Sequence, residues 1–179
     1  MKRTQLKFES IQQVVGNDDL SVILLTDKNR QRALSLVCDH QMTSQILLRI
    51  QSPSKCLTML PESLVQLLPG QYEMMIYGIH DGQYQVVLSD VDFKHSTRIR
   101  MSDAILLSII STYPLFIEEN LMLQQSIRFD ANSTGVAIPI NTMDIQRLNV
   151  ALQSAIDDED YKLASVIRDE INRRNKPEE

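Results

Sequence analysis

The residues that could do chemistry are few and widely separated in this chain. Three histidines, His40, His80 and His95, lack the HxH or HxxxH spacing that brings two imidazoles to one metal ion. The two cysteines, Cys38 and Cys56, form no CxxC pair and cannot build a disulfide framework. The sequence therefore predicts no confident metal site, and we expect both cysteines to be ordinary buried thiols.

A group of basic residues lies in the segment 93–100, which we predict to be a strand. On one face of such a strand Lys94, Arg98 and Arg100 would lie together with Ser96. Cations at that spacing could contact successive phosphates of a nucleic acid, although a solvated strand face is the commoner interpretation. With no tryptophan and only 5% aromatic residues, the chain is not expected to stack bases.

Composition places these residues in an ordinary globular chain of 179 residues, of which 43% are hydrophobic and 23% charged. The net charge is −5, with −2 before Asn141 and −3 from Asn141 onward, which argues against strong non-specific binding of nucleic acid. No apolar run approaches the ~20 residues that cross a bilayer. No apolar signal core follows the basic N-terminus, so we expect a cytoplasmic protein.

The candidate residues must be positioned by the strands and helices of the fold. The sequence predicts both kinds of element, and they do not follow a strict β-α-β order along the chain. Asp81-Gly82 joins two strand-like runs and predicts a tight hairpin, and Ser102 is expected to cap a helix with Asp103 at its positive end. We predict an α+β fold with a mixed or antiparallel sheet and packed helices over residues 1–128. Strands are expected at 6–15, 21–26, 33–38, 72–80, 83–90, 93–100 and 115–117, and helices at 41–50, 61–68, 104–110 and 118–125.

A linker is predicted at 129–141, and a helical hairpin at 142–179. Apolar residues recur at helical spacing on both sides of the acidic run 157–160. That run lacks the alternating spacing and the glycine of a calcium loop, so we interpret it as a helix cap and a solvated turn. Two helices this short must pack on the main domain, on a second copy or on another protein.

The first half of the hairpin reads Leu-x3-Leu-x2-Ala-Ile from Leu148 to Ile156, and the second half reads Asp-Tyr-x2-Ala-x2-Ile-Arg-Asp-x-Ile from Asp160 to Ile171. This pattern resembles the UVR motif, first named for the excision-nuclease subunits B and C. In that family the hairpin docks against another helical hairpin, so the resemblance implies a protein-interaction role, beside the simpler reading of a cover for the domain's own core. The residues that match the motif include Ala155, Asp160 and Asp169. The interaction residues it implies are Leu148, Leu152, Ile156, Tyr161, Ala164, Ile167, Arg168 and Ile171.

The segment 100–119 resembles the Arg-x-Ser-Asp-Ala-Ile helix of the bifunctional nuclease family and the Glu-Glu segment that follows it. Bacterial members of that family are hydrolases of DNA and RNA, and some carry a UVR hairpin after the nuclease domain. The resemblance implies Mg²⁺ or Mn²⁺ as cofactor where activity is retained. The catalytic candidates it implies are Arg100, Ser102, Asp103, Glu118 and Glu119.

Other signatures of that family are absent from the sequence. Met42 stands where members carry a glutamate, and the stretch 55–60 retains Thr58 but neither the histidine nor the aspartate of the family pattern. Phosphodiester hydrolysis needs a group that activates water and a group that stabilises the developing charge. We therefore expect a weakly active or inactive nuclease, with Asp103 serving the helix dipole.

Three hypotheses follow from the sequence. The first is a divergent nuclease-family protein that acts through its hairpin. The second is an active metal-dependent nuclease whose acidic site includes Asp103, Glu118 or Glu119. The third is a self-associating structural module, and exposed strand edges together with the hairpin's apolar stripe favour a homo-oligomer.

Overall fold

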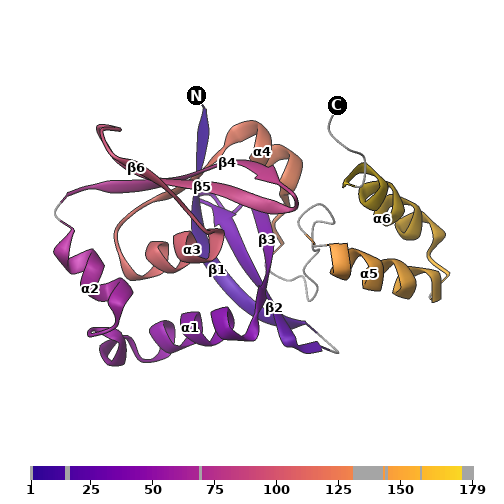
Figure 1. The fold of residues 1–179 in the computed structure, drawn as a ribbon, viewed down its shortest axis with the longest axis horizontal. Coiled ribbons are helices and arrows are strands. Elements are labelled where there is room, and N and C mark those ends of the chain that lie inside the picture. Colours follow the sequence, from indigo (N-terminus) through magenta and orange to yellow (C-terminus); the bar gives the residue numbers. More distant parts are fainter. Residues whose placement is uncertain are drawn as a thin grey trace.

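The computed structural model describes residues 2–14, 17–68, 70–130, 143, 145–157 and 159–174. Its main body is one mixed sheet with strand order β6-β5-β4-β7-β1-β2-β3-β8 (Figure 1). Neighbouring strands are antiparallel except β4 and β7, which are parallel. The expected α+β fold is confirmed. The strands are β1 (Arg3–Val14), β2 (Asn17–Asp27), β3 (Arg32–Asp39), β4 (Tyr72–His80), β5 (Gln83–Asp90), β6 (Ser96–Ile99), β7 (Leu115–Glu118) and β8 (Ile127–Arg128).

Two predicted hairpins organise the sheet. In the first hairpin, β2 pairs with β3, and the ladder begins where Leu20 lies opposite Asp39. In the second, β4 pairs with β5, and the ladder ends where His80 lies opposite Gln83. The loop between β4 and β5 is the dipeptide Asp81-Gly82, with φ of 48° and 74°. Positive φ at both positions is the geometry of a type I′ turn, which matches the twist of the strands it joins.

The sheet is curved, with helices on its hollow side (Figure 1). Ala104 and Ile105 of α3 and Ile46 of α1 are buried against strand residues such as Leu25 and Ile76. The helices of this body are α1 (His40–Gln51), the short 3₁₀ helix η1 (Pro53–Cys56), α2 (Leu60–Leu67), α3 (Met101–Ile110) and α4 (Glu119–Gln125).

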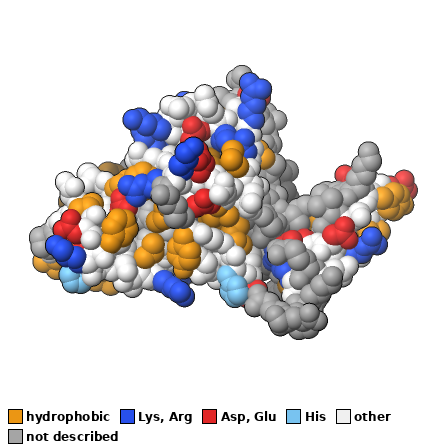
Figure 2. Space-filling view, turned by 90° about the horizontal axis from the view of Figure 1, so that it is seen from above, with side chains coloured by type: hydrophobic (Ala, Val, Ile, Leu, Met, Phe, Trp, Pro, Cys, Tyr) orange, Lys and Arg blue, Asp and Glu red, His pale blue; other side chains and the backbone are white. Residues whose placement is uncertain are grey.

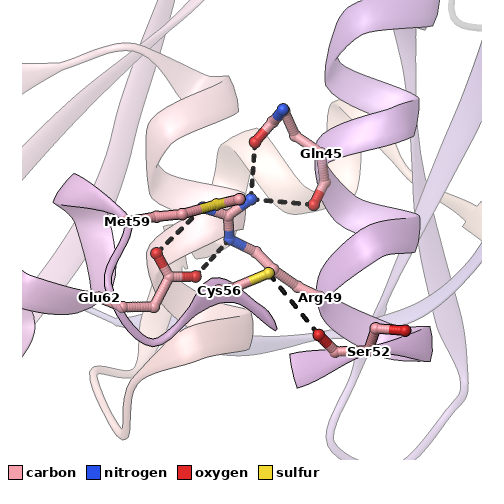
Figure 3. A network of polar contacts seen from close by, with 6 residues as sticks. All are labelled: Gln45, Arg49, Ser52, Cys56, Met59 and Glu62. Atoms are coloured by element: carbon pink, nitrogen blue, oxygen red, sulfur yellow. Dashed lines mark hydrogen bonds and ion pairs between the residues drawn. The ribbon is translucent and has the colours of Figure 1, made fainter. Parts of the chain in front are cut away.

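An ion pair inside the body joins α1 to α2 (Figure 3). The Arg49 guanidinium lies 2.6 Å from Glu62 Oε1 through Nε and 3.1 Å from Oε2 through Nη2. Arg49 also donates to Gln45 Oε1 at 2.7 Å. Only 5% of Arg49 and 9% of Glu62 are exposed, so each charge is compensated by the other in place of solvent.

Two local predictions around β6 were wrong. The strand begins at Ser96 rather than Phe93, because Phe93 has a φ of 55° and the Lys94 amide donates to Asp90 Oδ1 at 2.8 Å. These contacts make the preceding residues a turn. Ser102 does not cap α3, because the helix starts at Met101 with Arg100 in the capping position and no side-chain cap.

The C-terminal helices form the predicted hairpin, with α5 (Ile145–Asp157) and α6 (Tyr161–Arg174). They enclose a hydrophobic cluster separate from that of the sheet, made of Leu148, Ala155, Ala164 and Ile167. The predicted linker 129–141 lies mostly outside the described residues. The hairpin is thus a second small unit with a core of its own.

Candidate functional site

The first turn of α3 carries three of the predicted catalytic residues. Arg100 donates through Nε and Nη2 to the two carboxylate oxygens of Asp103, at 2.8 and 2.9 Å. This two-point contact raises the pKa of Arg100 through the hydrogen bond and the charge of Asp103. Ser102 lies between them on the same turn. Asp103 is therefore already engaged by a cation at the positive end of its helix.

The other two catalytic candidates have structural partners of their own. Glu118 Oε2 accepts from the Leu121 amide at 2.9 Å and so caps α4. Glu119 lies 3.9 Å from Lys2 Nζ in an exposed ion pair. Within the described part of the chain, no three His, Cys, Asp or Glu side chains form a group that could hold a metal ion.

The three predicted nucleic-acid contacts do not share one strand face. Lys94 is in the turn before β6 and lies 3.1 Å from Asp92, whereas Arg100 follows the strand and pairs with Asp103. Only Arg98 belongs to β6, opposite Val87. On the face of the molecule in Figure 2, basic side chains are interspersed with acidic ones over the described residues rather than gathered in one track.

A cleft of about 580 Å³ opens beside the first turn of α3, and we name it the α3 cleft. Its lining includes Leu36, Cys38 and Met42 from β3 and α1, and Tyr84 and Ile99 from β5 and β6. Strands β3 and β5 are far apart in the sheet order, yet both line the α3 cleft. The curvature of the sheet, visible in Figure 1, allows these two strands to approach each other.

One polar group in the wall of the α3 cleft has no hydrogen-bond partner within the part of the chain that the structure describes. Tyr84 is 7% exposed, and among the described residues its hydroxyl makes no hydrogen bond. The phenol is protonated at neutral pH, and burial raises the pKa of Tyr84 further, so its hydroxyl has one hydrogen to donate and an oxygen that can accept. Nothing in the local sequence marks this residue, because a tyrosine inside an apolar strand run is commonly a packing residue.

The hairpin residues implied by the UVR resemblance fall into two groups. Leu148, Ala164 and Ile167 are buried in the hairpin's own core, with Leu152 and Ile171 packed against them. The remaining residues are exposed: Ile156, Tyr161 and Arg168. The exposed pair Ile156 and Tyr161 flanks the turn between α5 and α6.

The hairpin reaches the sheet body at the β4–β5 turn. A side chain added at Gly82 would place its Cβ 2.8 Å from Arg174 Nη1 and 3.0 Å from the Met143 carbonyl oxygen. Arg174 itself donates to that carbonyl and pairs with Glu170 at 2.7 Å. Arg147 of α5 lines the α3 cleft near this contact.

Comparison with known proteins leaves the family open. No family model matches the sequence, and no curated protein matches it. Among the described helices, none is long and apolar enough to cross a membrane.

Proposed function

We propose that this chain is a cytoplasmic interaction protein, a weakly active or inactive relative of the bifunctional nucleases that docks a partner through α5–α6. The observation that carries this proposal is the construction of the hairpin. The buried residues described in its core all belong to α5 and α6, yet Tyr161 remains 69% exposed and Ile156 44% exposed beside the turn. Large apolar side chains exposed on a self-contained unit are typical of a docking surface.

The charges around these residues indicate the kind of partner. Asp157, Glu159 and Asp160 are exposed in the same turn. An acidic rim around two apolar residues suits a helical partner with an apolar stripe and basic flanks. This agrees with the resemblance, in which a UVR hairpin docks on another helical hairpin.

The local partners of the catalytic candidates support the low activity in this proposal. Asp103 is held by Arg100, Glu118 caps a helix, and Glu119 pairs with Lys2. A general base or metal ligand must have its lone pairs directed at the reacting group.

Cleavage of labelled single-stranded DNA and RNA by the purified chain with Mg²⁺ or Mn²⁺ tests this part. We expect no cleavage above a protein-free control, and any residual cleavage should be equal for Asp103→Ala. Metal-dependent cleavage that the substitution abolishes would overturn the proposal in favour of an active nuclease.

A photo-crosslinking amino acid placed at Tyr161 tests the docking surface in cells that produce the protein. We expect a discrete crosslinked partner that disappears when Ile156→Glu is added, because a charge in the apolar centre opposes docking. The control is the same photo-crosslinking amino acid placed at Gln146, which is exposed at the other end of α5. Equal crosslinking at both positions would contradict a surface at the turn.

Self-association is a second candidate function, favoured by a different observation. Three leucines of α2 are exposed, and so is Leu57 in the turn that precedes the helix; the four are Leu57, Leu60, Leu64 and Leu67. We name them the leucine face. Glu62, the charged residue of α2, is buried with Arg49, so the leucine face itself carries no charge. An uncharged apolar face can contact the same face of a second copy without bringing like charges together.

A further inference from the structure

The α3 cleft has the size and lining of a small-molecule site. Its volume of about 580 Å³ lies within the range typical of ligand pockets, roughly 300–1,000 Å³. Ile23, Leu36, Met42 and Ile105 contribute apolar walls that belong to or border the main core. A cleft with apolar walls and a few convergent polar groups accommodates a ligand with an apolar body.

Tyr84 lines the α3 cleft, and its hydroxyl is buried without a hydrogen-bond partner among the described residues. A buried donor without a partner is unfavourable relative to the same group in water, whereas a phenylalanine would fill the position at no such cost. An acceptor atom on a bound molecule would complete the hydrogen bonding of this phenol. Tyr84 therefore indicates a ligand that carries an acceptor.

The start of α3 is the second polar feature of the cleft. Met101 and Ser102 line it, and this 10-residue helix has no side-chain cap. The first amides of a helix are donors without intrahelical partners, and the dipole is positive there. Arg100 and Arg147 add basic side chains to the lining. The lining also includes one acidic residue, Asp81, but its side chain is 84% exposed to solvent.

We propose that the α3 cleft binds a small organic acid with an apolar body. The acidic group lies at the first turn of α3, where the helix amides and Ser102 can donate to it. The apolar body lies against Leu36, Met42 and Ile105, and Tyr84 donates to an oxygen of the ligand. Because Arg147 belongs to α5, a ligand in this place contacts both the sheet body and the hairpin.

This inference stands apart from docking at the hairpin turn, since its residues are different. It also differs from nuclease chemistry, because the ligand is bound and not cleaved. The Arg100–Asp103 pair remains intact in this arrangement, with Arg100 turned to solvent at the mouth of the cleft.

The probe we would use is 8-anilinonaphthalene-1-sulfonate, which joins an aromatic body to one anionic group and fluoresces in apolar surroundings. We expect saturable binding at one site per chain, competed by decanoate. Tyr84→Phe should weaken binding about fivefold, which is the loss of one hydrogen bond at ~1 kcal/mol. Tyr77→Phe, on an exposed tyrosine of β4, is the matched control and should bind like the original chain.

Two further measurements locate the probe. Cys38 lines the cleft and Cys56 does not, so bound probe should slow alkylation of Cys38 while that of Cys56 is unchanged. Leu64→Ser removes a side chain of the leucine face, and we expect it to leave the affinity unchanged. Thermal unfolding without probe should show Tyr84→Phe at least as stable as the original chain, which excludes misfolding as the cause.

Binding that is not saturable, that Tyr84→Phe leaves unchanged, or that Leu64→Ser abolishes would overturn the proposal. An unprotected Cys38 at saturating probe would do the same.

Discussion

At the scale of single residues, the structure gives each predicted catalytic carboxylate a local partner. Asp103 and Glu118 lie at the starts of α3 and α4, where a carboxylate is favoured by the helix dipole and by the free amides. The acidic residues of the segment that resembles a nuclease helix therefore have structural roles in this chain. The two residues with unusual surroundings, Arg49 and Tyr84, were not singled out by the sequence.

The buried Arg49–Glu62 pair makes a sharp prediction at this scale (Figure 3). Glu62→Gln should destabilise the chain by about 3–5 kcal/mol, because it leaves a buried guanidinium without its counter-charge. Urea unfolding followed by circular dichroism measures this change.

Two variants make the measurement decisive. Glu119→Gln removes an exposed carboxylate and should cost no more than about 1 kcal/mol. Arg49→Met combined with Glu62→Leu should recover most of the lost stability, since it removes both charges together. A Glu62→Gln chain as stable as the original would show that water reaches the pair.

At the scale of elements, helix α2 has an unusual division of its faces. Its charged residue is inside and its leucines are outside, which reverses the arrangement of an ordinary surface helix. The reversal has a physical cause, because Arg49 of α1 needs a carboxylate partner at that position. The leucines are then left on the solvent side.

We therefore expect the chain to associate through α2 at micromolar concentration. Leu64→Glu should shift the molecular mass measured by light scattering toward that of one chain, because a dimer contact would have to bury the new charge. Gln66→Glu adds the same charge to an exposed position of the same helix and should change the mass little. A Leu64→Glu chain with unchanged mass would exclude the leucine face as the contact.

At the scale of the whole molecule, the turn at Asp81-Gly82 is where the sheet body meets the hairpin. Gly82 has a φ of +74°, and a Cβ there would lie 3.0 Å from the Met143 carbonyl oxygen. Gly82→Ala should therefore cost about 1–2 kcal/mol from the left-handed backbone and also displace the hairpin.

Gly78 offers the matched control, because a Cβ at that position in β4 would meet nothing within 4 Å. Gly78→Ala should change the stability by no more than about 0.5 kcal/mol. Hydrogen exchange of the α5 and α6 amides should increase in Gly82→Ala alone. Equal exchange in the two variants would mean that the hairpin does not depend on this contact.

Much of the architecture follows from local patterns in the sequence. Alternating and helical periodicities predict most strands and helices, the Asp81-Gly82 dipeptide predicts its turn, and Pro61 marks the start of α2. These features depend on interactions between residues close in the chain, so the sequence alone determines them. The α+β fold class and the C-terminal hairpin were likewise predicted from local patterns in the sequence.

Other features were decided only when distant segments met. The parallel pairing of β4 with β7, the approach of β3 to β5 at the α3 cleft and the pairing of Arg49 with Glu62 join parts of the chain with no shared local pattern. The start of β6 was predicted wrongly for a similar reason: the turn contacts of Asp90 outweigh the strand preference of Phe93. Local propensity selects the elements, whereas burial and the pairing of polar groups select how they assemble and which side chains share a site.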